Sequence, residues 1–82
     1  MSTVAKIRKY RPGQQFVVSY KVKFFESGEE IHETDLFGLY KEIEQNDELT
    51  DGEVTMLLKD VIIGYKKCSH KDDVVIYNWW LY

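Results

Sequence analysis

The sequence predicts a small α+β domain: an antiparallel three- to four-stranded sheet with two helices packed on one face, in the order (β)ββααβ with an optional first strand. Residues 15–25 alternate apolar and polar side chains, as a half-buried strand does. Residues 51–66 repeat apolar side chains at helical spacing. The closing segment, residues 73–81, is apolar on both faces of a strand. A chain of 82 residues makes a single small domain, residues 1–82.

The N-terminal residues 1–14 are expected to form a mobile basic arm or an edge strand. Residues 3–10 have the pattern of a short strand, and residues 11–14 that of a turn, in which Pro12 presets φ and Gly13 adopts a positive φ. The long strand 15–25 follows, and residues 26–29 end it with Gly28 in a hairpin turn. Residues 30–34 would return as a short polar edge strand. The core side of the long strand carries Phe16, Val18, Tyr20, Val22 and Phe24.

Two helices are expected between the hairpin and the last strand. Asp35 would cap the first, over residues 36–45, whose apolar side chains form one stripe. Thr50 and Glu53 form a capping box for the second, over residues 51–66. The β-branched residues 61–63 are also compatible with the start of a strand. The helical interpretation rests on one apolar face, made by Val54, Leu57, Leu58, Val61, Ile62 and Tyr65.

The last strand is expected to carry more apolar surface than the helices cover. Helices on one side of the sheet leave its other face open. Strict alternation assigns one side to the helices, made by Val75, Tyr77, Trp79 and Leu81. The open side would then carry Val74, Ile76, Trp80 and Tyr82. The open side would bind a partner or a second copy, or else the N-terminal segment covers it.

Charge is strongly segregated along the chain. Residues 1–25 carry six Lys or Arg and no acid, whereas residues 26–60 carry twelve acids and two lysines, and the net charge is −3. Such a pattern creates two faces of opposite sign, or a basic edge that lies beside the molecule's own acidic residues. The second interpretation is favoured, because it needs no partner.

The sequence offers no motif for catalysis, a metal or a cofactor. Residues 47–58 lack two of the ligands of a calcium loop around Gly52. Cys68 and His70 lack the second ligand pair of a zinc site. His32 has no nucleophile motif to serve as a base. We therefore expect a protein that is not an enzyme and uses no cofactor.

These observations predict a regulator or inhibitor that acts by binding another protein or by forming a homodimer. A small phage protein that modulates a host enzyme would have this profile. The single cysteine fits a reducing compartment, and no apolar run approaches the roughly 20 residues of a membrane span, so a cytoplasmic location is expected. The expected partner-binding residues are the aromatic and apolar side chains of the last strand and the acids near the hairpin: Ile76, Trp79, Trp80, Tyr82, Glu29, Glu30 and Glu33.

Nucleic acid is the alternative partner. Basic residues interleaved with tyrosine suit a phosphate backbone, and here they would be Lys6, Arg8, Lys9 and Arg11. The acidic balance of the whole chain argues against this alternative. The acidic segment offers a second alternative. Its carboxylates would imitate a phosphate array and occupy a basic groove on an enzyme that normally holds nucleic acid.

Overall fold

The computed structural model describes residues 7–68 and 73–82. Within those residues the chain forms five strands and one helix in the order ββββαβ. None of the helical structure there is long and apolar enough to cross a membrane. The elements are β1 (Ile7–Tyr10), β2 (Gln14–Lys23), β3 (Glu30–Leu39), β4 (Asp47–Thr50), α1 (Asp51–Tyr65) and β5 (Asp73–Leu81).

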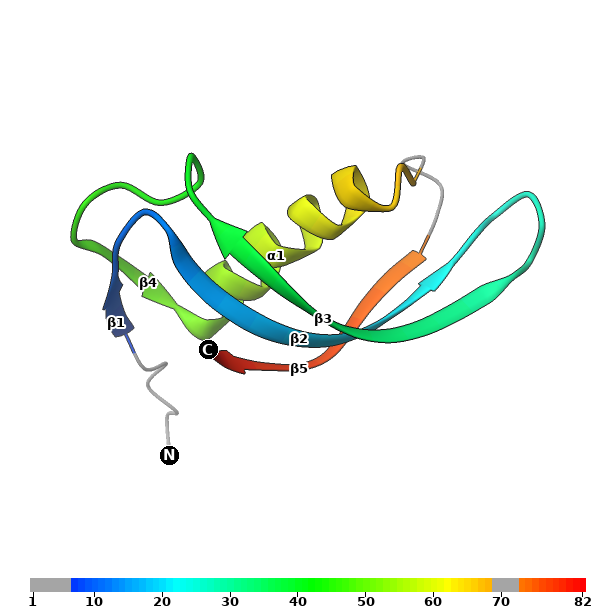
Figure 1. Ribbon diagram of the computed structural model, residues 1–82, viewed down its shortest axis with the longest axis horizontal. Helices are drawn as coiled ribbons and strands as arrows, with labels where there is room; N and C mark the ends of the chain where they lie inside the picture. The colour runs from blue at the N-terminus through cyan, green and yellow to red at the C-terminus, as the bar shows by residue number, and fades with distance from the viewer. Residues whose placement is uncertain (1–6, 69–72) are drawn as a thin grey trace, which may run out of the picture.

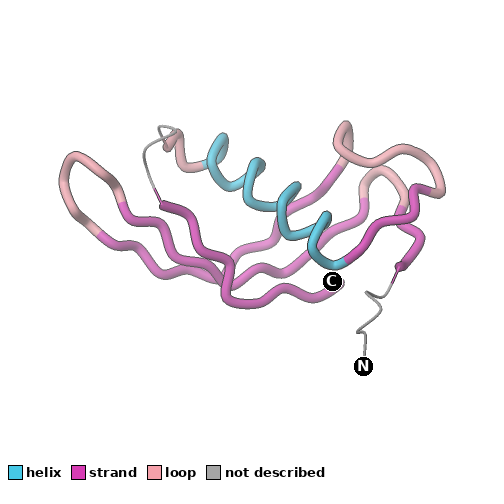
Figure 2. The backbone as a smooth tube through the Cα atoms, turned by 180° about the vertical axis from the view of Figure 1, so that it is seen from behind, coloured by secondary structure: helices cyan, strands magenta, loops and turns pink. Residues whose placement is uncertain are grey.

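The strands form two antiparallel sheets. The larger has the order β3-β2-β5, and the smaller pairs β1 with β4 (Figure 1). The expectation that the last strand returns beside the long strand is confirmed. Helix α1 lies along one face of the larger sheet (Figure 2). The β2–β3 hairpin projects past the start of β5 at the opposite end from β1 and β4.

The core lies between α1 and the larger sheet. One side of β2 is almost completely buried, as its period-two pattern predicts. Val54, Leu58 and Ile62 of α1 pack against this side. Other core residues come from β1, β3, the loop after β3 and β5: Tyr10, Phe37, Leu39, Ile43 and Val74. The buried residues of β2 are Phe16, Val18, Tyr20 and Val22.

The predicted turns and the helix start are confirmed. Gly13 has φ +88° and the amide of Gln14 donates to the carbonyl of Arg11 at 3.1 Å. Gly28 has φ +71° in the β2–β3 turn. The Thr50 hydroxyl accepts from the Glu53 amide, and the Glu53 carboxylate accepts from the Thr50 amide, so the capping box is complete. The helix continues through Tyr65, which settles residues 61–63 as helical.

The predicted two-helix layer is wrong, because residues 36–45 do not form a helix. Strand β3 continues through Leu39, and residues 40–46 connect it to β4. All ten residues of β2 have a partner in β3, from Gln14 opposite Leu39 to Lys23 opposite Glu30. Asp35, the expected helix cap, instead accepts a hydrogen bond from the Tyr20 hydroxyl at 2.6 Å.

The physical reason is that the strand buries Phe37 and Leu39 of this segment and also pairs with β2. A ten-residue helix is marginal on its own and relies on packing for its stability. Phe37 and Leu39 enter the core on alternate positions of β3, and Ile43 enters it from the following loop, 2 % exposed. A helix over these residues would remove the hydrogen-bonded pairs between β2 and the second half of β3. The strand is therefore the more stable conformation.

Candidate partner-binding face

A β-bulge decides which side chains of β5 face away from α1. Asn78 pairs with Ser19 but Ile76 pairs with Tyr20, so Tyr77 is an extra residue in β5. One extra residue inverts the alternation of side chains beyond it. The uninterrupted alternation expected from the sequence is therefore wrong. On the α1 side lie Val74, Ile76 and Trp79, and on the other side lie Val75, Tyr77, Asn78, Trp80 and Tyr82.

Of the four predicted partner-binding residues in β5 and the C-terminus, two therefore belong to the inner side. The Trp79 ring lies edge-on to Phe16, with centroids 5.4 Å apart, and its Nε1 donates to Thr55 Oγ1 of α1 at 2.9 Å. Ile76 packs against the core. Trp80 and Tyr82 lie on the outer side and remain 46 % and 78 % exposed.

We call the outer side of the β3-β2-β5 sheet the open face. Trp80, Val17 and Leu36 form one row across its three strands. Beside this row, the amide of Tyr82 donates to the carbonyl of Gln15 at 3.1 Å. The exposed apolar side chains that define the open face are Leu36, Tyr40, Val75, Tyr77, Trp80 and Tyr82.

Tyr40 completes the aromatic end of the open face. Gly38 lies opposite Gln15, and a Cβ atom built at Gly38 would stand 2.5 Å from Cε2 of Tyr40. The Tyr40 ring therefore lies over the backbone of Gly38, where any side chain would displace it. Leu36, Tyr40 and Tyr77 are functional candidates that sequence reasoning missed. The sequence pattern predicts a helix for the first two, and Tyr77 lies on the open face only because of the bulge in β5.

The middle of the open face is polar but internally paired. Ser19 Oγ and Thr34 Oγ1 lie 2.7 Å apart in a hydrogen bond. The His32 and Tyr77 rings stack with an interplanar angle of 7° and a centroid distance of 6.1 Å. Together with Ser19 and Thr34 these rings line a shallow cavity of about 330 Å³. The other neighbour of the His32 ring is Glu30, whose Oε2 lies 3.8 Å from His32 Nε2.

The far end of the open face, near the hairpin turn, carries both signs of charge. Lys21 Nζ lies 3.5 Å from a carboxylate oxygen of Glu30. Lys23 lies opposite Glu30 in one neighbouring strand and opposite Asp73 in the other. The described charges of the open face therefore balance. Glu29 and Glu30, two of the predicted acidic contacts, lie at this hairpin end, away from the row of Trp80.

Glu33, the third predicted acidic contact, lies on the α1 side of the sheet and is paired with residues of the same molecule. Lys66 Nζ lies 2.8 Å from Glu33 Oε2, and the Tyr20 hydroxyl donates to Asp35 and, at 3.2 Å, to Glu33. The hydrogen bond from Lys66 lowers the pKa of Glu33 and raises that of Lys66. Burial, followed by the Asp35 hydrogen bond, raises the pKa of Tyr20. These groups form a tie between β2, β3 and the C-terminal end of α1.

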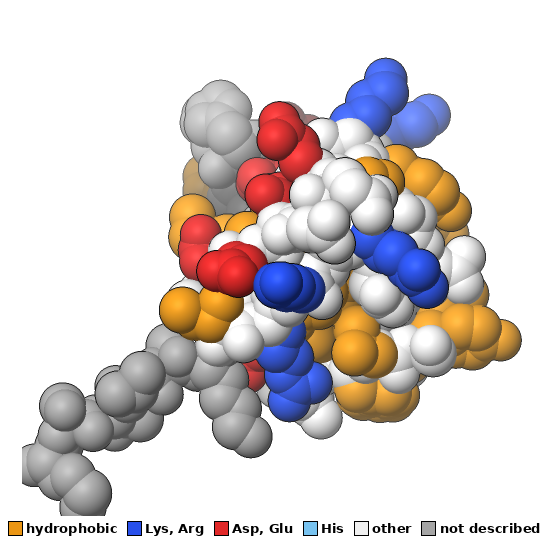
Figure 3. Space-filling view, turned by 90° about the vertical axis from the view of Figure 1, so that its left-hand side faces the viewer, with side chains coloured by type: hydrophobic (Ala, Val, Ile, Leu, Met, Phe, Trp, Pro, Cys, Tyr) orange, Lys and Arg blue, Asp and Glu red, His pale blue; other side chains and the backbone are white. Residues whose placement is uncertain are grey.

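The basic segment lies beside acidic residues of the same molecule. Strand β1 pairs with β4, and the register places Lys9 opposite Glu48 and Tyr10 opposite Asp47. Figure 3 views this end of the molecule and shows Lys and Arg side chains next to Asp and Glu side chains. Arg8, opposite Leu49, and Arg11 are exposed, while Lys6 lies outside the described residues. The arrangement is the one in which a basic edge meets the molecule's own acids.

No group of three or more metal-ligating side chains occurs in residues 7–68 and 73–82. His70, considered above as a zinc ligand, lies outside those residues. No family model, curated protein or solved structure matched this chain in comparisons with known proteins.

Proposed function

We propose that this protein acts by binding another protein through the open face, as a non-enzymatic regulator or inhibitor. The observation that carries the proposal is Trp80, an aromatic anchor that is half exposed in a row with Val17 and Leu36. Trp and Tyr are the residues that dominate protein–protein hot spots. Covering the exposed part of such a ring contributes about 1–2 kcal/mol to binding.

The size of the aromatic surface supports one interface of modest area. An aromatic side chain buries roughly 150–250 Å² when fully covered. Four of them at about half exposure supply roughly 400 Å², about half of one partner's share of a standard interface. Neighbouring aliphatic and polar groups of the sheet would supply the remainder. The four aromatic side chains are Tyr40, Tyr77, Trp80 and Tyr82.

Charge on the open face favours a protein over nucleic acid as the partner. Phosphate binding needs an excess of cations, whose counterion exchange supplies most of the affinity. The described charges of the open face balance, and Lys21 is already near Glu30. The basic residues of β1 lie at another place, beside β4. The nucleic-acid alternative predicts binding of a labelled oligonucleotide that falls steeply with salt and is lost on replacing Arg8, Lys9 and Arg11.

Affinity purification with matched variants tests the proposal. Tagged wild type, Trp80→Ala and Tyr77→Ala are expressed in the native cell and recovered after brief cross-linking. Met56→Ala is the control, because Met56 is 70 % exposed on α1, away from the open face. We expect wild type and Met56→Ala to recover a common protein and both open-face variants to lose it. Equal recovery by Trp80→Ala would contradict the proposal.

A further inference from the structure

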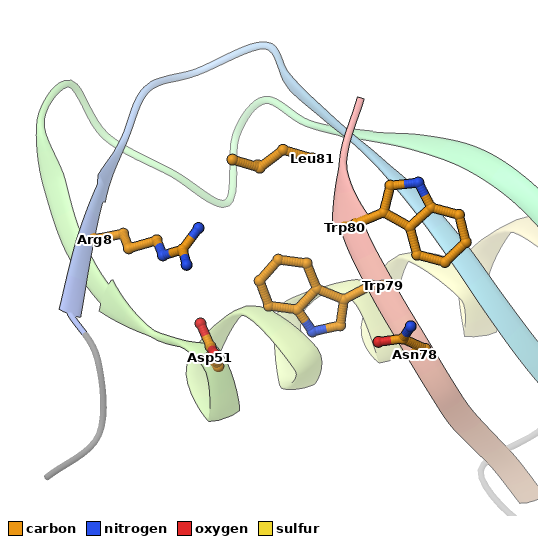
Figure 4. Close-up of a pocket in the computed structure, with 6 residues that line it drawn as sticks. All are labelled: Arg8, Asp51, Asn78, Trp79, Trp80 and Leu81. Carbon is orange, nitrogen blue, oxygen red and sulfur yellow. The ribbon is translucent and has the colours of Figure 1, made fainter.

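A second cavity lies on the other side of β5, between this strand and β1. Its volume is about 320 Å³, at the small end of the range for ligand sites. Four consecutive residues, 78–81, form one wall, and Arg8 of β1 and Asp51 at the start of α1 form the other (Figure 4). A wall of consecutive strand residues presents both main chain and side chains to the cavity.

The strand register shows which main-chain groups of β5 point into this space. The bond from Tyr82 N to the carbonyl of Gln15 fixes the phase of the ladder with β2. Hydrogen-bonded and non-hydrogen-bonded pairs alternate in an antiparallel ladder. Trp80, two positions from Tyr82, therefore directs its main-chain N–H and C=O toward β2. Trp79 and Leu81 direct theirs away from β2, toward the free edge.

Beyond its bulge, the edge of β5 lacks two of the usual devices that prevent pairing with another strand. Described residues 73–82 pair with β2 alone. Between Val74 and Leu81 the strand carries no charged residue and no proline, the residue types that normally protect an edge. The bulge at Tyr77 confines the regular free edge to residues 78–81, the same residues that line the cavity.

The opposite wall carries a cation with no ion pair among the described residues. Arg8 is absent from the close ion pairs there, although Asp51 lies across the same cavity. Asp51 stands in the first turn of α1, where the helix dipole partly offsets its charge. Nearby Tyr10 is buried, and its hydroxyl has no hydrogen-bond partner. The wall formed by β1 and α1 thus offers an unpaired positive group to an occupant.

We propose that this cavity binds an extended segment of a partner protein, which adds a strand to the edge of β5 and directs an acidic side chain toward Arg8. The main chain of the segment would pair with Trp79 and Leu81, in the manner of β-strand addition. Side chains on one side of the segment would meet Trp79 and Leu81, and those on the other side would meet Trp80. The inference rests on the proposed function in one respect, that the segment belongs to the partner protein.

A second copy of the chain fits this position less well than a lone extended segment. The edge strands of the larger sheet are β3 and β5, and β3 carries the charged residues Glu30, Glu33 and Asp35. Pairing two copies of β5 would bring an entire sheet into the space that β1 borders. A segment with both edges unpaired occupies only the width of one strand.

The test uses random octapeptides displayed on phage, selected on the immobilised full-length protein and then synthesised with a fluorophore. Fluorescence anisotropy compares wild type with Leu81→Pro, which removes the outward N–H and leaves the bonds to β2 in place. Leu81→Ala is the matched control for the side chain. We expect selected peptides to share an acidic position, and Leu81→Pro to weaken binding about tenfold. Leu81→Ala should weaken it less than Leu81→Pro, and Arg8→Gln should abolish the acidic preference.

Amide hydrogen exchange provides a measurement on the unmodified chain. Peptide binding should slow exchange at Trp79 and Leu81, whereas the Trp80 amide, already bonded to β2, should change little. The inference is overturned if no peptide is enriched, if both Leu81 variants weaken binding equally, or if protection appears elsewhere. Concentration-dependent dimerisation that Leu81→Pro abolishes would also overturn it, in favour of a second copy.

The outcome is separable from that of the proposed function. Tyr77 belongs to the open face and does not line this cavity. If Tyr77→Ala loses the cellular partner and Leu81→Pro keeps it, the proposed function stands and the edge site falls. If peptides bind at the β5 edge while recovery of the cellular partner is unaffected by Tyr77→Ala and Trp80→Ala, the open-face proposal falls and the edge site stands.

Discussion

Trp79 and Trp80 are neighbours in the chain with opposite surroundings. Trp79 contacts Phe16 and is tied to α1 through Thr55, whereas the Trp80 ring lies on the open face. Truncating a packed aromatic removes its contacts and leaves a cavity. Trp79 should therefore contribute mainly to the stability of the fold, and Trp80 mainly to binding a partner.

We predict that Trp79→Ala lowers the free energy of unfolding by about 3 kcal/mol. Trp80→Ala should lower it by only about 1 kcal/mol, because nearly half of that side chain is exposed in the monomer. Urea titrations followed by circular dichroism measure both values. Equal destabilisation by the two substitutions would mean that the Trp80 ring is packed within the monomer.

At the level of elements, regular patterns identified β2, α1 and β5 from the sequence, and α1 and β5 nearly to the residue. These elements have strict periodicity or a complete capping box, which are local signals. The helix expected over residues 36–45 failed because its apolar spacing also suits a strand followed by a loop. Pairing with β2, a contact between distant parts of the chain, decides between them.

The candidate site was predictable in part for the same reason. An aromatic strand with one uncovered face follows from the sequence, and Trp80 and Tyr82 lie on that face. Its other members depend on a bulge at Tyr77 and on the turn that returns Tyr40 over Gly38. Neither feature has a local sequence signal, since each depends on the register between strands.

Two glycines test how far local conformation sets stability. Gly13 has φ +88° in the turn between β1 and β2, whereas Gly64 lies in the last turn of α1 with no atom near its missing Cβ. We predict that Gly13→Ala destabilises the protein by about 1–2 kcal/mol. Gly64→Ala should stabilise it by about 0.5–1 kcal/mol, from higher helix propensity. Thermal unfolding of both variants checks the opposite signs, and a stabilising Gly13→Ala would refute the turn geometry.

At the level of the whole molecule, one polar cluster joins the sheet to the end of the helix opposite the capping box. Lys66 follows α1, Glu33 lies in β3, and the Tyr20 hydroxyl bridges Glu33 and Asp35 from β2. Apart from this cluster and the hydrogen bond from Trp79 to Thr55, the contact between α1 and the sheet in the described residues is apolar. Lowering the pH should therefore weaken this polar cluster more than the apolar core.

The sign of the effect follows from the lowered pKa of Glu33, whose largest cause is the hydrogen bond from Lys66. A carboxyl whose pKa is lower in the folded state stabilises the fold above the ordinary value of 4.5 and loses that contribution as pH falls through the lowered value. Lys66→Met removes the partner, so the loss of melting temperature between pH 7 and about pH 3 should be smaller in this variant than in wild type. Lys67→Met, which changes the same charge at an exposed neighbour, is the control and should behave as wild type does. Identical acid sensitivity of wild type and Lys66→Met would show that the Glu33–Lys66 pair does not couple the helix to the sheet in solution.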